Sequence, residues 1–326
     1  MNHLKQTILE TAAPDLAEIE TALKNNLNTY LDLVSQAAGH ILFSGGKRFR
    51  PLLMVLSARI CGYSGTYDKI FSTIFEYLHT ATLLHDDIVD EATLRRGKPV
   101  ANSIWGSATA VLVGDFLLAR SLSIAAKTNK IEVIQAIGEV TEDMAQGEIH
   151  QLLNKGSITL TEEEYKEVIR RKTASLIQGA CRTGALIAEA SPEQEKALTA
   201  FGLNLGFAFQ MADDLLDYIS DTETLGKTIG ADLREGKMTL PLIHTLKNAN
   251  PTDRKTIKNI IQNPDFSEND FNTLKRLLDT YGGIRYTTDL AAQYVDEAKK
   301  ALSIFDSSKT KNLLMMLADY TLNRNL

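Results

Sequence analysis

The sequence predicts an all-α fold, and three observations lead to this prediction. Apolar residues recur at helical spacings of three and four, as in the stripe Ile70, Ile74, Tyr77, Leu78, Ala81 and Leu84. Only 7 prolines interrupt 326 residues, so helix breakers are scarce. No alternating strand pattern of useful length occurs, and no glycine-rich nucleotide loop follows an apolar run. Helix is therefore favoured throughout.

Composition narrows the class of protein. Hydrophobic residues make up 44% and charged residues 23%, values typical of a globular chain with a sizeable core. A net charge of -6 without a dense Lys/Arg block makes nucleic acid an unfavoured partner. Cys61 and Cys181 lack metal-ligand spacing and fit reduced thiols of a cytoplasmic protein. The N-terminal residues form no apolar leader, and no run reaches roughly 18 apolar residues, so we expect no transmembrane segment.

Two capping boxes predict helix starts in the middle of the chain. Thr161 is followed at the third position by Glu164, and Ser191 by Gln194, with Pro192 at the first helical position. We expect long helices over roughly 162–189 and 192–219.

Two acidic motifs carry the strongest chemical signal. The pattern D-D-x-x-D occurs once with Asp86, Asp87 and Asp90, and again with Asp213, Asp214 and Asp217. On a helix, residues four apart share a face, so each motif presents a carboxylate pair. Hard oxygen ligands favour Mg²⁺, which shares its coordination with phosphate oxygens, so a magnesium diphosphate is the expected ligand. If both motifs bind one ligand, residues 1–326 form a single domain; a solvated acidic face is the alternative for either motif alone.

Cations occur where a diphosphate needs them. Arg95 and Arg96 follow the first motif in a loop, and guanidinium groups bind phosphate bidentately. Lys47, Arg48 and Arg50 follow a glycine pair, although this segment by itself could be an ordinary surface loop. His79 lies seven residues, or two helical turns, before Asp86 on the same face, which favours a ligand-binding role. His85 has no such support and is interpreted as structural.

These motifs together resemble the trans-polyprenyl diphosphate synthases. The resemblance covers roughly residues 40–245 in family order and rests on Gly-Gly-Lys47-Arg48-Phe-Arg50-Pro, His79 to Asp90, Arg95-Arg96-Gly, Gly114-Asp115-Phe, Lys172-Thr173, Phe209 to Asp217 and Gly226-Lys227-Thr228. It implies the isoprenoid synthase fold, an antiparallel helix bundle around a deep central cavity, in a homodimer.

The resemblance also implies residue roles. Lys47, Arg50, His79 and Arg96 are expected to hold isopentenyl diphosphate. The allylic diphosphate is expected to contact Arg95, Lys172, Thr173, Gln210 and Lys227. Mg²⁺ is assigned to Asp86, Asp90 and Asp213, with Asp87 and Asp217 in the same metal-binding set. The residues expected to act in catalysis are Asp86, Asp90, Asp213, Lys172 and Lys227.

The expected reaction is ionisation of the allylic diphosphate, attack by the double bond of isopentenyl diphosphate, and loss of a proton. The sequence shows no convincing Ser-His-Asp or Cys-His constellation, and this chemistry needs no side-chain nucleophile. A class I terpene cyclase and a non-catalytic subunit of a heteromeric synthase are the alternatives. The second acidic motif and the Lys47/Arg50 cluster argue against the cyclase, and the presence of both motifs argues against the non-catalytic subunit.

Product length depends on what lies one turn before the first motif. In this family, bulky aromatic residues at the places of Ala81 and Thr82 give short products. Here both residues are small, so we expect a long membrane-partitioning product of hexaprenyl to nonaprenyl length, octaprenyl above all, with Tyr77 and Leu78 lining a tunnel. A shorter geranylgeranyl product, or small residues that only serve helix packing, are the alternatives.

Overall fold

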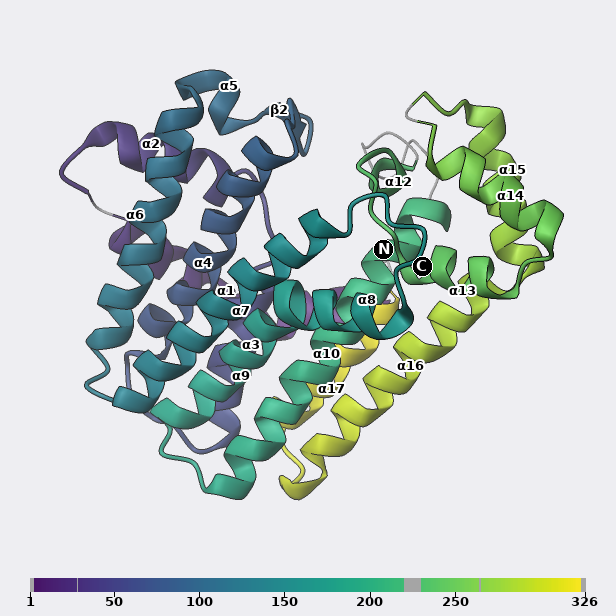
Figure 1. Cartoon of the computed structure of the whole chain (residues 1–326). Helices are drawn as coiled ribbons and strands as arrows, with labels where there is room; N and C mark the ends of the chain where they lie inside the picture. Colours follow the sequence, from purple (N-terminus) through teal and green to yellow (C-terminus); the bar gives the residue numbers. More distant parts are fainter. Residues whose placement is uncertain (1–2, 28, 220–229, 264, 324–326) are drawn as a thin grey trace. The chain divides into compact units, whose positions relative to one another are not determined.

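The computed structural model describes residues 3–27, 29–219, 230–263 and 265–323. The all-α prediction is confirmed (Figure 1). The helices are α1 (His3–Asn26), α2 (Asp32–Leu42), α3 (Phe49–Ile60), α4 (Asp68–Val89), α5 (Ala101–Trp105), α6 (Ser107–Ala126), α7 (Ile131–Leu153), α8 (Glu162–Ile169), α9 (Ser175–Ile187), α10 (Pro192–Ile219), α12 (Ala231–Arg234), α13 (Leu240–Asn248), α14 (Pro251–Ile261), α15 (Glu268–Thr280), α16 (Gly283–Ala301) and α17 (Lys309–Leu322). A two-residue hairpin, β1 (Leu94–Arg95) and β2 (Lys98–Pro99), supplies the strands of the described chain.

The two predicted long helices are present, but the first is interrupted. Residues 162–187 form α8, one π-helical turn η1 (Arg170–Ala174) and α9. Both capping boxes are confirmed: Thr161 and Glu164 exchange backbone and side-chain hydrogen bonds, and so do Ser191 and Gln194. The π turn places one extra residue in the helix between two otherwise regular segments.

The chain divides into two compact units. Unit 1 contains residues 1–142, 176–202 and 299–320, and unit 2 contains residues 143–175, 203–298 and 321–326. Several helices, α7 and α10 among them, contribute residues to both. That residues 1–326 form one functional domain around a central cavity stays a prediction.

In unit 1, α4 packs against α1, α3 and α6. The predicted apolar stripe faces this core: Ile74, Tyr77, Leu78, Ala81 and Leu84 are at most 1% exposed, and Ile70 is half-buried. Because α4 is buried along most of its length, the acidic motif at its end is rigidly placed. Both cysteines are free, and burial raises the pKa of Cys61 to about 11 and that of Cys181 to about 12.

Helix α6 is the one helix in the described part of the chain with the length and apolar composition of a membrane span. One face is buried in unit 1 and contributes Ala110, Val113, Leu117 and Ile124 to the core. Its other side exposes apolar residues, with Leu112 67% and Leu122 45% exposed.

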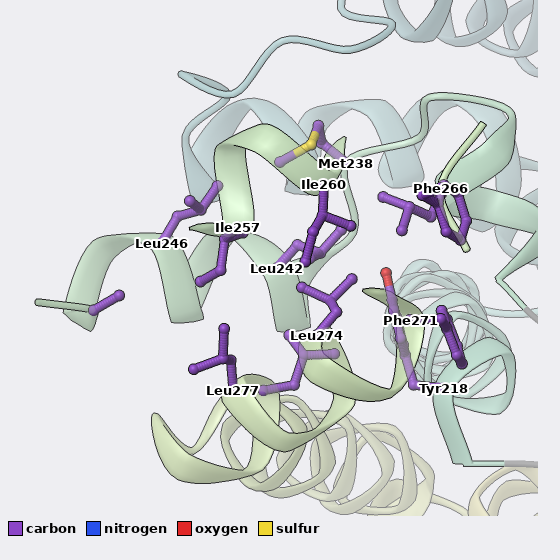
Figure 2. Close-up of a cluster of buried hydrophobic side chains, with 13 residues drawn as sticks. Tyr218, Met238, Leu242, Leu246, Ile257, Ile260, Phe266, Phe271, Leu274 and Leu277 are labelled. Carbon is purple, nitrogen blue, oxygen red and sulfur yellow. The ribbon is translucent and has the colours of Figure 1, made fainter. Parts of the chain in front are cut away.

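In unit 2, a hydrophobic cluster holds the end of α10 (Figure 2). Tyr218 is fully buried, stacks on Phe271 with ring centroids 6.3 Å apart, and shares a 2.7 Å hydrogen bond with Thr239. The remaining buried members are Leu233, Met238, Leu242, Leu246, Ala249, Ile257, Ile260, Phe266, Leu274, Leu277 and Leu278. Because Tyr218 directly follows Asp217, this packing fixes the last turn of the second acidic motif.

Candidate active site

The first acidic motif lies at the C-terminal end of α4. Asp86 is half-buried, and Asp90 is the C-cap residue. Asp87 is only 2% exposed, and its Oδ1 accepts hydrogen bonds from Arg95 Nε at 2.8 Å and Arg95 Nη2 at 2.7 Å. The central aspartate of the motif is therefore bound to the arginine of the following hairpin.

The glycine-flanked cationic loop is anchored by Arg48, which sequence reasoning left without a role. Arg48 adopts φ 49°, in the left-handed region, and is 5% exposed. Its guanidinium donates to Glu20 at 2.6 Å, to Glu76 at 2.8 Å and to the carbonyl of Leu42 at 2.7 Å. Fully paired charges of this kind hold a loop in one conformation. Glu20 and Glu76 carry no sequence motif, so only the three-dimensional structure identifies them.

The same loop is held from its other side by the hairpin. Arg96 Nη1 donates to the carbonyl of Gly45, whose φ of 111° suits glycine. On α4, burial first and then the charges of Arg50, Arg95, Arg96 and Arg48 lower the pKa of His79 well below 6.5. Of the cations predicted to bind isopentenyl diphosphate, Arg50 and Arg96 thus lie near His79 in unit 1.

Unit 2 places the second acidic motif on α10. Asp213 is exposed, Asp217 is half-buried, and Asp214 is 4% exposed. The backbone amide of Asp232, in α12, donates to Asp217 Oδ2 at 3.1 Å. Burial above all, and then the nearby charge of Asp232, raises the pKa of Asp214 to about 8. The two outer aspartates therefore lie nearer solvent than the central one, as in the first motif.

A chain of hydrogen bonds joins this motif to the π turn. Tyr165 donates to Asp214 Oδ2 at 2.6 Å, and Gln210 Nε2 donates to Asp214 Oδ1 at 2.7 Å. Gln210 Oε1 accepts from the hydroxyl of Thr173 at 2.7 Å. The side chains of Thr173 and Gln210, which were predicted to share a ligand, are thus in direct contact.

The π turn packs against α7. Lys172 forms an ion pair with Glu148, and Arg171 donates to Asp143 at 2.7 Å and to Gln146 at 3.0 Å. A Cβ on Gly147 would lie 2.5 Å from the backbone nitrogen of Lys172, so only glycine permits this approach. No sequence pattern indicated this contact, because it joins residues of two different helices.

Of the predicted site residues, Lys227 lies outside the described residues. Unit 1 holds Lys47, Arg50, His79, Asp86, Asp87, Asp90, Arg95 and Arg96, and unit 2 holds Lys172, Thr173, Gln210, Asp213 and Asp217. His85 lies against α6: its Nε2 is 3.2 Å from the carbonyl of Val111, and a Cβ on Gly114 would be 2.3 Å from the ring.

The residues expected to control product length lie on α4. Ala81 is fully buried, and the hydroxyl of Thr82 donates to the carbonyl of His79 at 2.8 Å. One turn further from the acidic motif, Leu78 is 1% exposed, and Tyr77 is buried with its hydroxyl bonded to the carbonyl of Leu23 at 2.7 Å. The ring of Tyr77 is therefore fixed against α1.

The donor sets fit a divalent cation that also binds phosphate oxygens. Each motif offers carboxylates alone, and the last turn of α4 contains no basic residue although the helix dipole there is negative. A bound cation would offset this unfavourable charge. Within the described ranges, no three His, Cys, Asp or Glu side chains are grouped to hold a metal ion by themselves.

Comparison with known proteins places the chain in a family. The polyprenyl synthetase family model matches residues 31–278. The chain is 37% identical to octaprenyl diphosphate synthase of Escherichia coli (strain K12), covering 98% of this chain and 99% of that one. It is 37% identical to an all-trans-nonaprenyl-diphosphate synthase of Rhodobacter capsulatus (98% of each chain). It is 34% identical to a short chain isoprenyl diphosphate synthase of Methanothermobacter thermautotrophicus (89% of this chain, 90% of that one).

Comparison with solved structures also leads to prenyl diphosphate synthases. A polyprenyl synthase from Caulobacter crescentus CB15, complexed with calcium and isoprenyl diphosphate, aligns with a TM-score of 0.92 at 38% identity over 98% of this chain and 97% of that one. A geranylgeranyl pyrophosphate synthetase from Pyrococcus horikoshii Ot3 aligns at 0.91 with 31% identity over 98% and 99%. The predicted isoprenoid synthase fold is thereby confirmed. The comparisons support a prenyltransferase and not the alternative of a terpene cyclase. This chain belongs to the polyprenyl synthetase family and is a prenyltransferase of isoprenoid biosynthesis.

Proposed function

We propose that this enzyme is a long-chain trans-prenyltransferase. It joins an allylic diphosphate, farnesyl diphosphate above all, to successive isopentenyl diphosphates and releases diphosphate, with octaprenyl diphosphate as the main product. The observation that carries the proposal is the small size of Ala81 and Thr82, one turn before the first acidic motif on α4, where Thr82 is half-buried. Relatives of similar identity are named as octaprenyl, nonaprenyl and short chain synthases. Overall identity therefore does not indicate the product length, and individual side chains must decide it.

Small residues at these two places would obstruct a growing apolar tail less than aromatic rings would. A helix rises about 1.5 Å per residue, so Ala81 and Thr82 lie roughly 6 to 8 Å along the axis from Asp86. The hydroxyl of Thr82 is bonded to the carbonyl of His79, so that tail would meet its methyl group and not an unsatisfied polar atom. Tyr77, tied to Leu23, would form part of the wall one turn deeper.

We assign the two diphosphates to separate groups of cations. Lys47, Arg50, His79 and Arg96 would hold isopentenyl diphosphate, and Arg95, Lys172, Thr173, Gln210 and Lys227 would hold the allylic diphosphate. The closeness of Arg50 and Arg96 to His79 supports the first assignment. The Thr173–Gln210 hydrogen bond supports the second.

Mg²⁺ would be held by Asp86 and Asp90 of one motif and by Asp213 and Asp217 of the other, with the diphosphate completing its coordination. When bound, it neutralises the charge that develops on the departing diphosphate. Lys172, Lys227 and Arg95 would share that task as fixed donors. The calcium and isoprenyl diphosphate bound by the Caulobacter relative support a divalent cation at this site.

Residues of this chain would hold the substrate-binding loop in place and keep water away from the reaction. The Arg48 and Arg96 anchors hold the Gly45–Lys47 loop in place before substrate arrives, which reduces the entropy lost on binding. Residues from the buried face of α4 would keep water away from the allylic cation. The proton lost after condensation would pass to the released diphosphate, because no side-chain base is required.

We further propose a cytoplasmic homodimer. Helix α6 buries one side in unit 1 but exposes Leu112, Leu122 and Val111, an apolar surface that a second copy would cover. The most apolar stretch of α6 is only 39% buried in one chain. A homodimer interface would bury more of it.

Incubation of the purified protein with Mg²⁺, farnesyl diphosphate and labelled isopentenyl diphosphate, followed by product sizing, tests the proposal. Octaprenyl diphosphate as the dominant product supports it. A product that stops at geranylgeranyl length contradicts it, and size-exclusion chromatography with light scattering reports the oligomer in the same preparation.

A further inference from the structure

The ammonium group of Lys47 is held by a tyrosine from the C-terminal helix. Lys47 Nζ donates to the hydroxyl of Tyr320 at 3.0 Å and lies 5.0 Å from the centroid of its ring. Tyr320, on α17, is 7% exposed, whereas Lys47 itself is exposed. Both residues belong to unit 1, although 273 positions separate them in the sequence. A buried, rigid aromatic residue therefore fixes the end of a flexible surface side chain.

The partner of Lys47 differs in chemistry from the partners of two other predicted diphosphate-binding cations. Lys172 is paired with Glu148, and Arg95 with Asp87, so each shares its charge with a carboxylate. Among the residues that the structure describes, no carboxylate lies within ion-pairing distance of Lys47. A phenol oxygen and an aromatic face attract an ammonium without cancelling its charge. Because an ammonium has three donors and Tyr320 takes one, two remain for an anion.

The neighbouring residues make this arrangement rigid. Lys47 directly precedes Arg48, whose guanidinium is bound to Glu20, Glu76 and the carbonyl of Leu42. The backbone of Lys47 is thus fixed by Arg48 and the tip of its side chain by Tyr320. A lysine held at both ends loses little further freedom when it binds an anion.

We propose that Tyr320 is a positioning residue for the homoallylic substrate: it holds Lys47 Nζ where the diphosphate of isopentenyl diphosphate binds. This inference rests on the proposed assignment of Lys47 to that diphosphate. It makes α17 part of the isopentenyl diphosphate site, so the C-terminal helix contributes to substrate affinity and not only to packing.

Steady-state kinetics of the full-length enzyme with Mg²⁺ test the proposal through four variants. Tyr320→Phe keeps the ring and its packing but removes the hydroxyl, and it should raise the KM for isopentenyl diphosphate about 3- to 10-fold. Tyr320→Leu removes both contacts and should raise it roughly 10- to 50-fold. The KM for the allylic substrate and kcat should change less than about twofold in either variant. Tyr281→Phe, which removes a phenol bonded to Asp253 and Asn250 in unit 2, is the control and should change none of these constants.

A double variant separates positioning from packing. If Tyr320 acts through Lys47, Tyr320→Leu should add no further rise in the KM for isopentenyl diphosphate once Lys47 is alanine. An equal rise in the wild-type and Lys47→Ala backgrounds, or an unchanged KM in folded Tyr320→Phe and Tyr320→Leu, overturns the inference. If Lys47→Ala alone leaves this KM unchanged, the assignment of Lys47 has failed instead. Circular dichroism melting of each variant confirms that it is folded.

Discussion

The phenol of Tyr165 and the carboxylate of Asp214 form a buried hydrogen bond of 2.6 Å in unit 2. Asp214 also accepts from Gln210, and Gln210 accepts from Thr173, so the central aspartate of the second motif binds protein groups. The first motif repeats this arrangement, since Asp87 is buried and bound to Arg95. In both motifs the central aspartate orients neighbouring residues, which leaves the more exposed outer pair as the candidates for metal binding.

Replacing Tyr165 by Phe tests this role. The variant leaves Asp214 Oδ2 buried without its donor, so the free energy of unfolding should fall by roughly 1–3 kcal/mol. Because Gln210 and Thr173 depend on Asp214 for their orientation, the KM for the allylic substrate should rise while that for isopentenyl diphosphate stays the same. Urea denaturation and two-substrate kinetics measure the two effects. Equal rises in both KM values would show that the hydrogen-bond chain does not serve the allylic site.

Gly147 on α7 should tolerate no side chain. In Gly147→Ala the new methyl would lie 2.5 Å from the Lys172 nitrogen and 2.9 Å from Arg171 Cβ, so the π turn must move. We expect a loss of about 1–3 kcal/mol in the free energy of unfolding, together with a lower kcat.

Gly138, in the same helix, is the matched control. A methyl group there meets nothing within 4 Å, so Gly138→Ala should stabilise the protein by about 0.5–1 kcal/mol through its helix propensity. Urea denaturation compares the two variants directly. Equal stabilities would mean that α7 does not constrain the π turn.

Both acidic motifs should be needed for turnover. Asp86→Ala and Asp213→Ala should each lower kcat by at least about 100-fold, because transition-state charge would lose its metal. Neither should change the free energy of unfolding by more than roughly 0.5 kcal/mol, since neither aspartate is fully buried. The exposed Asp296→Ala variant serves as the control. Near wild-type rates at saturating Mg²⁺ in either motif variant would refute a shared metal site.

His79 should make stability depend on pH. Its folded pKa lies well below 6.5 because of burial and four nearby arginines, whereas the unfolded histidine titrates near 6.5. Below that pH the unfolded chain binds a proton that the folded chain does not, so stability falls as pH falls. Between pH 7.5 and 5.5, wild type should lose roughly 1 kcal/mol more than His79→Gln. Urea titrations at both pH values measure the difference; identical losses would show that His79 titrates normally.

Local patterns predicted the helices well, because helix formation depends on near neighbours. The stripe from Ile74 to Leu84 is buried as its spacing predicted, and the boxes at Thr161 and Ser191 begin their helices. The π turn between α8 and α9 could not be predicted from local patterns, and it lies in close contact with Gly147 of another helix.

The candidate site was predicted in its residue types but not in its internal connections. Arg48 stood among three cations of one loop, and nothing in the sequence distinguished the buried anchor from its exposed neighbour Lys47. The distinction comes from Glu20 and Glu76, which lie 28 positions away on either side. Tyr320 could not be found for the same reason, since its contact with Lys47 spans 273 positions.

Product analysis of Ala81→Tyr beside wild type shows whether the growing tail passes this place on α4. A tyrosine at this fully buried place would overpack α4 where we propose that the growing tail passes, one turn from Asp86. We expect octaprenyl diphosphate from wild type and geranylgeranyl or farnesyl diphosphate from the variant, with the rate of the first condensation retained. An unchanged long product from a folded Ala81→Tyr enzyme would show that the tail does not pass Ala81 and that this residue does not set product length.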